Sequence, residues 1–307
     1  MANCFFCYKP VNEGEYHSSC CKRFFGVNGL PKLALNKQLL NDLATKTVNE
    51  RIAITGVQPK LSLSLEKEKG KDRLTIVGLW GEFILKPQHE HYPSMPEVED
   101  LTMHLAEVFK LPVCKHALIR TTEGNLAYVA KRFDRVNGEK VHVEDFCQLS
   151  EFLTENKYKG SYEQAGKIIL KYCTNSGIDV LTYFELVVFS FLTGNNDMHL
   201  KNFSLLHGED AIYFAPAYDL LNINLVYPPD KEELALTLNA KKKKINRKDF
   251  NALAKSLKIL PKVEENAYKK FIEGRKLIVD KVENSFLTND FKEQFIEIWD
   301  KKIQQIS

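Results

Sequence analysis

The spacing of apolar residues changes along this chain, from the alternation of strands to the longer period of helices. Leu61, Leu63 and Leu65 alternate with polar residues, and the β-like runs "RLTIVG" and "GEFILKPQ" follow, as in half-buried strands. From about Val143 onward, helical spacing dominates, most clearly in Tyr162–Tyr172, Val180–Thr193, Asp249–Leu257, Val263–Val282 and Phe291–Ile306. A β-rich first part and a helical second part predict an α+β protein with two lobes.

Further elements complete this prediction. Residues 31–50 carry leucines at helical spacing, and Glu97–Phe109 is typical of an amphipathic helix packed on the sheet. The segments "CKHALIRT" and "NLAYVAKRFDR" predict two more strands. A turn in "DRVNGEKV" places the lobe boundary near residues 134–143. We therefore expect a cysteine-rich head over residues 1–30, an N-lobe over 31–138 and a helical C-lobe over 139–307.

Composition narrows the class of protein. The 307 residues, of which 44% are hydrophobic and 27% charged, suit a globular protein with a well-buried core. A net charge of +3 is too close to neutrality to indicate a nucleic-acid binder. Val180–Thr193 contains Glu185 and is too short to cross a bilayer, so it predicts a core helix. Seven cysteines and no secretory signal favour the reducing cytoplasm.

The loop "GNNDMHLKNFS" directly follows this apolar helix. Asp197 and Asn202 are five positions apart, the spacing of the base and the metal-binding amide in kinase catalytic loops, and Lys201 between them could neutralise a phosphate. Asp219 in "FAPAYDLLN" comes where a second magnesium ligand is expected. The alternative is that Asp197 and Asn202 only cap a helix or shape a turn.

The first half offers parts of a nucleotide site. Gly56, in "ITGVQPKLSL", lies at a turn between β-like segments where backbone N–H groups could face phosphates. Lys86 ends a buried β-type run, where an ammonium needs an anionic partner, and Glu99 on the following helix is the candidate. A strand lysine paired with a helix glutamate orients nucleotide phosphates in kinases.

Five stretches together make the chain similar to the HipA-like serine/threonine protein kinases of bacterial toxin–antitoxin systems: "AKRFDR", "EDFCQ", "GNNDMHLKNFS", "APAYDLLN" and "LALTLNAKKKK". The resemblance extends from about Arg51 to the C-terminus. It implies a bilobed protein-kinase-like fold that uses ATP and Mg²⁺. It also leads us to expect a chain without the extra N-terminal domain of full-length HipA, like the short HipT toxins, whose missing domain is a separate protein.

The resemblance also implies roles for individual residues. Asp197 accepts the proton of the substrate hydroxyl with Lys201 beside it, Asn202 and Asp219 hold magnesium, and Lys86 contacts the nucleotide phosphates. The other nucleotide-binding positions that it implies are Thr55, Gly56, Val57, Gln58, Pro59 and Lys60 in the phosphate loop, Glu99 paired with Lys86, Lys131, Arg132 and Phe133 at the hinge to the adenine, and His199, Lys201, Asn202, Tyr218 and Asp219 near the phosphates.

The chain departs from HipA just before the phosphate loop. HipA has an autophosphorylated serine three residues before the loop glycine, where this chain has Ala53. HipT-like relatives carry a hydroxyl immediately before that glycine, and Thr55 occupies this position. Thr55 is therefore the candidate autophosphorylation site, ahead of Ser62 and Ser64, which occupy alternate strand positions. Its phosphate would repel the ATP phosphates. The alternative is a β-branched residue that only enters a turn.

The cysteine-rich head contains a C-x2-C pair and an H-x2-C pair nine residues later. Cys4, Cys7, His17 and Cys20 could bind a structural zinc ion, with Cys21 as an alternative to Cys20, or they are reduced core thiols. Cys114, Cys147 and Cys173 are expected to be core thiols. The basic run Lys241–Lys244 is either a solvated face or an edge that meets an acidic or RNA-bound partner.

Three functions remain open at this point. The first is a toxin kinase that phosphorylates a serine of an aminoacyl-tRNA synthetase and controls itself by autophosphorylation; the resemblance implies this target, and antitoxin partners, one of them a helix-turn-helix protein that links the complex to DNA. The second is a small-molecule kinase, since antibiotic and choline kinases share the Asp–Asn spacing. The third is a non-catalytic regulatory partner of a DNA-binding antitoxin. No membrane association is expected.

Overall fold

The computed structural model describes residues 2–33, 60–67, 72–78, 80–136, 138–227 and 232–307. The chain divides into two compact units, each of which is described by itself. Unit 1 comprises Met1–Asp100, Cys114–Gly138 and Asn284–Phe286, and unit 2 comprises Leu101–Val113, Glu139–Glu283 and Leu287–Ser307. This mixed α+β architecture confirms the predicted fold class.

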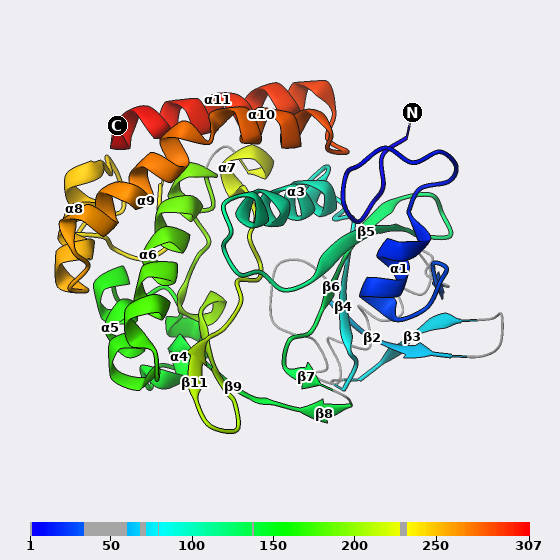
Figure 1. The fold of residues 1–307 in the computed structure, drawn as a ribbon, viewed down its shortest axis with the longest axis horizontal. Coiled ribbons are helices and arrows are strands. Elements are labelled where there is room, and N and C mark those ends of the chain that lie inside the picture. The colour runs from blue at the N-terminus through cyan, green and yellow to red at the C-terminus, as the bar shows by residue number, and fades with distance from the viewer. Residues whose placement is uncertain (1, 34–59, 68–71, 79, 137, 228–231) are drawn as a thin grey trace. The chain divides into compact units, whose positions relative to one another are not determined.

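Unit 1 is built on a six-stranded sheet with the strand order β1-β3-β2-β4-β6-β5 (Figure 1). Every neighbouring pair is antiparallel except β1 with β3. Alternation of the leucines places Leu63 in the core with Leu61 and Leu65 packed against it, as the sequence predicts. The strands are β1 Lys32–Leu33, β2 Leu61–Glu66, β3 Arg73–Val77, β4 Phe83–Pro87, β5 His116–Arg120 and β6 Leu126–Lys131, with the short β7 Arg135–Val136 after them.

The helix predicted over residues 31–50 is wrong at its start. Lys32–Leu33 form β1, where the Lys32 amide donates to the Asp72 carbonyl at 2.9 Å and Leu33 is buried. Pairing with β3 and burial of Leu33 outweigh the helical preference that the leucine spacing indicates. Such tertiary contacts cannot be read from the periodicity of one segment. Residues 34–50 lie outside the described residues.

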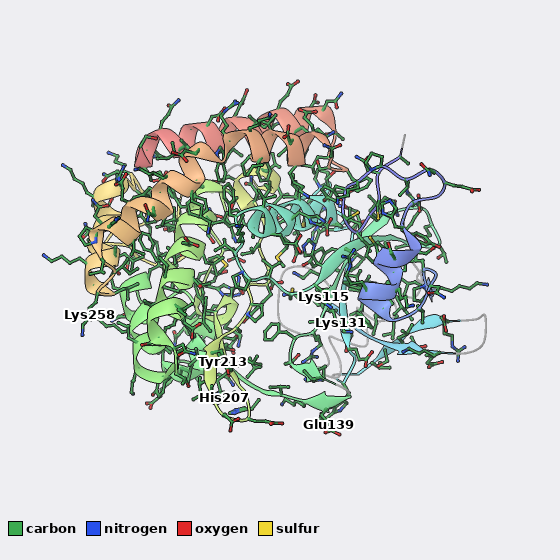
Figure 2. The ribbon with its side chains drawn as sticks, viewed as in Figure 1. Lys115, Lys131, Glu139, His207, Tyr213 and Lys258 are labelled. Atoms are coloured by element: carbon green, nitrogen blue, oxygen red, sulfur yellow. The ribbon has the colours of Figure 1, made fainter. Side chains whose placement is uncertain are left out.

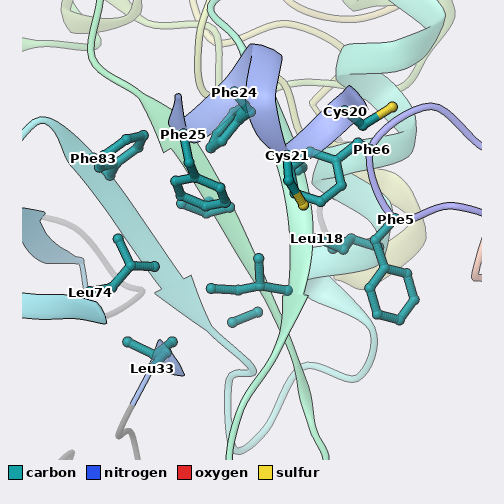
Figure 3. Close-up of a cluster of buried hydrophobic side chains, with 14 of the residues drawn as sticks. Phe5, Phe6, Cys20, Cys21, Phe24, Phe25, Leu33, Leu74, Phe83 and Leu118 are labelled. Atoms are coloured by element: carbon teal, nitrogen blue, oxygen red, sulfur yellow. The ribbon is translucent and has the colours of Figure 1, made fainter. Parts of the chain in front are cut away.

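The N-terminal head packs against one face of this sheet. Helix α1 (Ser18–Phe25) presents Phe24 and Phe25, whose rings lie 5.7 and 5.1 Å from that of Phe83 on β4 (Figure 3). Phe5 and Phe6 are also buried in this cluster. The head therefore belongs to the hydrophobic core of unit 1.

Unit 2 is largely helical and is organised around α6 (Ser176–Leu192), most of whose residues are buried. A three-stranded antiparallel sheet, β11-β10-β9, lies beside it, and Figure 2 shows His207 and Tyr213 on its hairpin. Helix α3 (Met95–Val108) begins in unit 1 and ends in unit 2. The remaining elements of unit 2 are β8 Glu139–Lys140, β9 His142–Asp145, α4 Phe146–Leu149, η1 Thr154–Asn156, α5 Tyr162–Tyr172, η2 Leu200–Asn202, β10 Ser204–His207, β11 Ile212–Phe214, α7 Ile223–Val226, α8 Arg247–Ser256, α9 Pro261–Glu273, α10 Arg275–Glu283 and α11 Asn289–Ile306.

The helical predictions hold for most of unit 2, with one correction. The predicted helix Val263–Val282 is two helices, α9 and α10, separated at Gly274. A Cβ at Gly274 would lie 2.3 Å from the Phe109 ring. The backbone at the break between the two helices therefore packs closely against this ring. Among the described residues, no helix has both the length and the apolar character needed to cross a bilayer.

Candidate active site

Gly194 lies two residues after the end of α6 and begins the following loop. Gly194 has a φ of +67°, and its N–H donates to the Phe191 carbonyl at 3.1 Å, which is a left-handed helix end that favours glycine. A Cβ there would lie 2.8 Å from Asn222 Oδ1 and 3.0 Å from Asn224 Oδ1. Since Asn222 Oδ1 also accepts from the Leu225 N–H, moving it would cost a hydrogen bond.

Replacing Gly194 by Ala is expected to lower the free energy of unfolding by about 2–3 kcal/mol, from left-handed strain and the lost Asn222 contact. The matched control is Gly177→Ala in the first turn of the same helix, where a Cβ meets nothing within 4 Å. That change should be neutral or stabilising by about 0.4–1 kcal/mol. Chemical denaturation of both variants measures the difference, and equal effects would contradict the assigned role of Gly194.

The loop after Gly194 closes on itself through Asn202. The Asn202 side-chain amide donates to the Asp197 carbonyl at 3.0 Å, and Asn195 Oδ1 accepts from the Asp197 N–H at 3.2 Å. The Asp197 carboxylate is half-buried, whereas Asn202 is only 6% exposed. This turn explains the five-residue spacing and leaves the Asn202 side-chain oxygen as the atom that could bind a cation.

Tyr158 is a site residue that the sequence did not reveal. Its hydroxyl donates to Asp197 Oδ1 at 2.6 Å, and its ring lies edge-on to His199 at 5.0 Å. The loop carrying it is tied to the catalytic loop because the Leu200 N–H donates to the Lys157 carbonyl at 3.1 Å. No local sequence pattern could identify Tyr158, since it lies 39 residues before Asp197.

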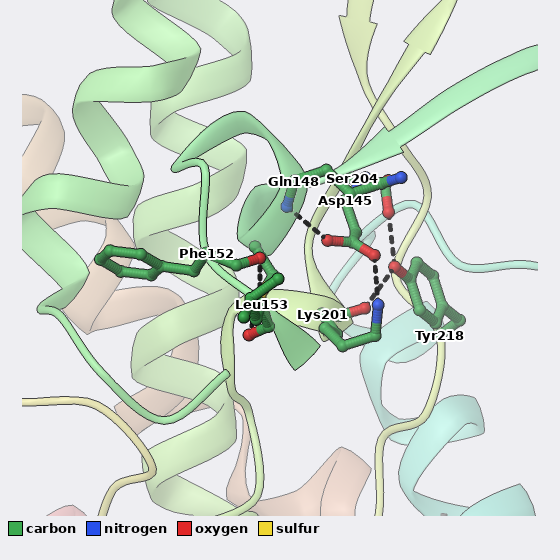
Figure 4. A network of polar contacts seen from close by, with 8 residues as sticks. Asp145, Gln148, Phe152, Leu153, Lys201, Ser204 and Tyr218 are labelled. Atoms are coloured by element: carbon green, nitrogen blue, oxygen red, sulfur yellow. Dashed lines mark hydrogen bonds and ion pairs between the residues drawn. The ribbon is translucent and has the colours of Figure 1, made fainter. Parts of the chain in front are cut away.

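Lys201 is held by an ion pair within unit 2. Its Nζ lies 2.7 Å from Asp145 Oδ2 (Figure 4), and Asp145 also caps α4 in a capping box with Gln148. Asp145 therefore has two roles: it holds the Lys201 side chain and it caps the N-terminus of α4. It lies in the stretch "EDFCQ", which marked it as part of the family pattern but assigned it no role.

Asp219 has a strained backbone, with a φ of +56°. Left-handed non-glycine residues persist where the surrounding structure holds them, often at functional sites. The preceding Tyr218 is anchored to the catalytic loop: its hydroxyl donates to the Lys201 carbonyl at 2.9 Å and lies 2.5 Å from Ser204 Oγ (Figure 4). These bonds join the segment carrying Asp219 to the loop carrying Asn202.

His199 is buried and uncharged. Burial lowers the pKa of His199 to about 4, against the opposing attraction of Asp197. The imidazole is therefore neutral at neutral pH. Its Nδ1 is buried and has no hydrogen-bond partner among the residues that the structure describes.

Unit 1 contains a buried lysine–glutamate pair. Lys86 on β4 lies on the face opposite Phe83 and Leu85, and its Nζ is 2.5 Å from Glu99 Oε1 on α3. The two residues are only 5% and 1% exposed, and Lys86 Nζ lies 5.4 Å from the centre of the Tyr128 ring. The ion pair that the sequence suggested is thus formed.

The predicted hinge residues lie at the end of β6 and directly after it. Lys131 Nζ lies 5.7 Å from the centre of the Phe83 ring, and Arg132 makes two hydrogen bonds to Asp134, at 2.9 and 2.7 Å. Arg132 and Phe133 are half-buried. Nothing here tests their contact with adenine, so this role stays a prediction.

Most of the predicted phosphate loop lies outside the described residues. This applies to Thr55, Gly56, Val57, Gln58 and Pro59, and to Ala53, while Lys60 is described and half-buried. Ser62 is buried and accepts from the Gly81 N–H at 3.0 Å, a structural role in keeping with its strand position.

The cysteine-rich head and the basic run Lys241–Lys244 lie in different units. Cys4, Cys7, His17 and Cys20 converge in unit 1, with their ligand atoms within 4.8 Å of one another. In unit 2, Lys241 pairs with Asp249 at 2.7 Å and Lys242 with Glu232 at 3.3 Å, so half of the basic run Lys241–Lys244 makes local ion pairs. The other thiols, Cys114, Cys147 and Cys173, are buried as expected.

The strand lysine paired to a helix glutamate, together with an Asp–Asn loop after a buried helix, defines a protein with a kinase-like fold. A family model described as "HipA-like C-terminal domain" matches residues 52–282. The chain belongs to this family.

Similar proteins agree with this assignment. "Putative kinase Y4dM" of Sinorhizobium fredii is 34% identical over 208 residues, covering 63% of this chain and 50% of the relative. "Serine/threonine-protein kinase toxin HipA" of Shewanella oneidensis is 27% identical over 210 residues, covering 62% and 47%. The chain spans about half the length of these curated relatives.

A solved structure gives the same picture of the fold. It is the Shewanella oneidensis complex of HipA, HipB and operator DNA, which matches with a TM-score of 0.67 and 21% identity, covering 85% of this chain and 68% of that chain.

Proposed function

We propose that this chain is an ATP- and Mg²⁺-dependent serine/threonine protein kinase that acts as a toxin in the bacterial cytoplasm. The observation that carries the proposal is the closed loop in which the Asn202 amide binds the Asp197 carbonyl. This turn presents a carboxylate and an amide oxygen from one rigid segment. Phosphoryl transfer needs little more than such positioning, together with cations on the phosphates.

Each residue has a role in this proposal. Asp197 accepts the proton of the acceptor hydroxyl, and Asn202 and Asp219 hold magnesium, which neutralises charge on the phosphates. Lys86, oriented by Glu99, contacts the nucleotide phosphates. His199 lies beside the phosphates as a neutral imidazole, and Lys201 adds positive charge beside the loop.

Substrate and partners come from the relatives. We propose a serine of a translation-related protein, an aminoacyl-tRNA synthetase, as the acceptor. HipB and operator DNA accompany HipA in the matching structure, which supports a DNA-binding antitoxin as partner. Self-control by autophosphorylation at Thr55 completes the proposal.

Incubating the purified chain with γ-labelled ATP and a bacterial lysate tests the reaction class. The expected result is labelled protein whose phosphate maps to serine or threonine. This phosphate should be less stable to alkali than phosphotyrosine. Label confined to a small metabolite would replace this function with the small-molecule kinase. Tight binding to an antitoxin–operator complex without phosphoryl transfer would favour the regulatory partner instead.

Tyr158→Phe is expected to lower kcat about tenfold and to leave KM for ATP unchanged, because the hydroxyl positions the Asp197 carboxylate through a hydrogen bond to a charged group. Tyr158 is 42% exposed, so stability should change by less than about 1 kcal/mol. Tyr172→Phe, at a similar exposure of 37%, is the matched control. Steady-state kinetics of both variants measure kcat and KM. An unchanged kcat in Tyr158→Phe would show that the hydrogen bond from Tyr158 to Asp197 has no part in the reaction.

A further inference from the structure

The N-terminal head brings four metal-ligating side chains together from two turns. Cys4 and Cys7 lie on a tight turn in which the N–H groups of Cys7 and Tyr8 both point to the Cys4 carbonyl, at 3.3 and 2.9 Å. His17 and Cys20 lie at the start of α1. All four ligand atoms are within 4.8 Å of one another, although Cys4 and Cys20 are separated by fifteen intervening residues.

The measured separations are those of ligands around one small ion. Cys7 Sγ lies 3.5 Å from His17 Nδ1, and Cys20 Sγ lies 3.8 Å from the same nitrogen. Zinc–sulfur bonds of about 2.3 Å and zinc–nitrogen bonds of about 2.0–2.1 Å at tetrahedral angles separate such atoms by about 3.5–3.6 Å. These two sulfur–nitrogen separations therefore match those around a bound zinc ion to within a few tenths of an ångström.

The Pro10 carbonyl orients the His17 ring for metal binding. His17 Nε2 lies 3.1 Å from the Pro10 carbonyl. A carbonyl can only accept, so Nε2 carries the proton and the Nδ1 lone pair faces the thiols. Second partners of this kind fix metal-binding histidines in other proteins.

Two of the three sulfur atoms accept hydrogen bonds, as suits thiolates. The His17 N–H donates to Cys4 Sγ at 3.4 Å, and Arg23 Nη2 donates to Cys20 Sγ at 3.4 Å. Three thiolates with one Zn²⁺ leave a net charge of −1, and the Arg23 guanidinium offsets it.

We propose that Cys4, Cys7, His17 and Cys20 bind one structural Zn²⁺ ion, a site independent of the proposed kinase reaction. Soft thiolates with an imidazole select zinc over magnesium or calcium. Four protein ligands complete a tetrahedron, so no position is left for a catalytic water. Cys21 is not a ligand: its thiol points in a different direction from that of Cys20 (Figure 3), and the ligand atoms that converge are those of Cys4, Cys7, His17 and Cys20.

The ion stabilises more than the head. Phe5 and Phe6, between the first two ligands, are buried in the core of the sheet. The Phe5 carbonyl accepts from the Leu118 N–H at 3.1 Å, which covers the edge strand β5. Removing zinc should therefore loosen the face of the sheet that carries Phe83, opposite Lys86, because metal binding to such a site is coupled to folding.

Metal analysis of the full chain, purified without chelators, tests the proposal. We expect about one zinc per chain, and Cys7→Ser should lose it, while Cys21→Ala should keep it. A zinc-free wild-type chain after incubation with zinc, or a Cys7→Ser chain with full zinc content, would overturn the assignment.

Two measurements use the wild-type chain alone, so they do not depend on whether a variant folds. Exchange of the metal for Co²⁺ should give the intense visible bands of a tetrahedral ion and thiolate charge-transfer bands for three sulfurs. Chelation should also speed hydrogen exchange of the Leu118 amide. A colourless cobalt form, or unchanged exchange after complete metal removal, would contradict the proposed site and its structural role respectively.

Discussion

Asp197→Asn should lower the rate of phosphoryl transfer by about 10²- to 10⁴-fold, the usual contribution of a positioned general base. The amide is isosteric with the carboxylate and can still accept the Tyr158 hydroxyl, whose donor atom lies 2.6 Å from Asp197 Oδ1. It cannot take up the proton of an acceptor hydroxyl. Nucleotide affinity and stability should therefore change little while kcat is lost, and isothermal titration with single-turnover kinetics measures the two separately.

Asp210→Asn is the matched control for this variant. Asp210 is exposed in the turn between β10 and β11, so the same chemical change there should leave activity as it is. Full activity in Asp197→Asn would show that the loop after α6 is only a structural turn.

Lys86→Met should lower phosphoryl transfer at least about a hundredfold, because it removes a cation from the nucleotide phosphates. It should also destabilise the protein by about 3–5 kcal/mol, since the carboxylate of Glu99, which is 1% exposed, loses a partner 2.5 Å away. Lys32→Met, at an exposed position of the same sheet, should change neither property. Denaturation and kinetic measurements on the same preparations test both effects.

A double variant separates the two consequences. Lys86→Met with Glu99→Gln replaces the buried ion pair by two neutral side chains, which should recover most of the lost stability. Activity should remain lost because the phosphate cation is still absent. Recovery of activity together with stability would mean that the pair only supports the fold and does not contact the nucleotide.

The sequence predicted those features that depend on local spacing. Asp197 and Asn202 lie in one loop, so a five-residue interval was enough to recognise their turn. The Lys86–Glu99 pair was also predictable, because a lysine in a buried strand needs an anion and a helix followed directly. Their chemical roles, and that of Asp219, stay predictions.

Features that arise from packing between distant segments were missed. Tyr158 and Asp145 reach the loop that carries Asp197 and Lys201 from separate segments, and neither carries a local motif that assigns it a function. The break at Gly274 lies against the Phe109 ring, and β1 is paired with β3. Periodicity records how a segment could bury its own apolar face, and it contains no information about such partners.

Phosphoproteomics after brief expression tests the central claim most directly. Bacteria expressing the chain are compared with bacteria expressing Asp197→Asn at equal protein levels. The account predicts serine or threonine phosphosites that appear only with the unaltered chain, on a target protein and, under the Thr55 proposal, on the kinase itself. Identical phosphoproteomes in the two cultures, with the unaltered chain folded and present, would contradict the claim that the Asp197 loop catalyses protein phosphorylation.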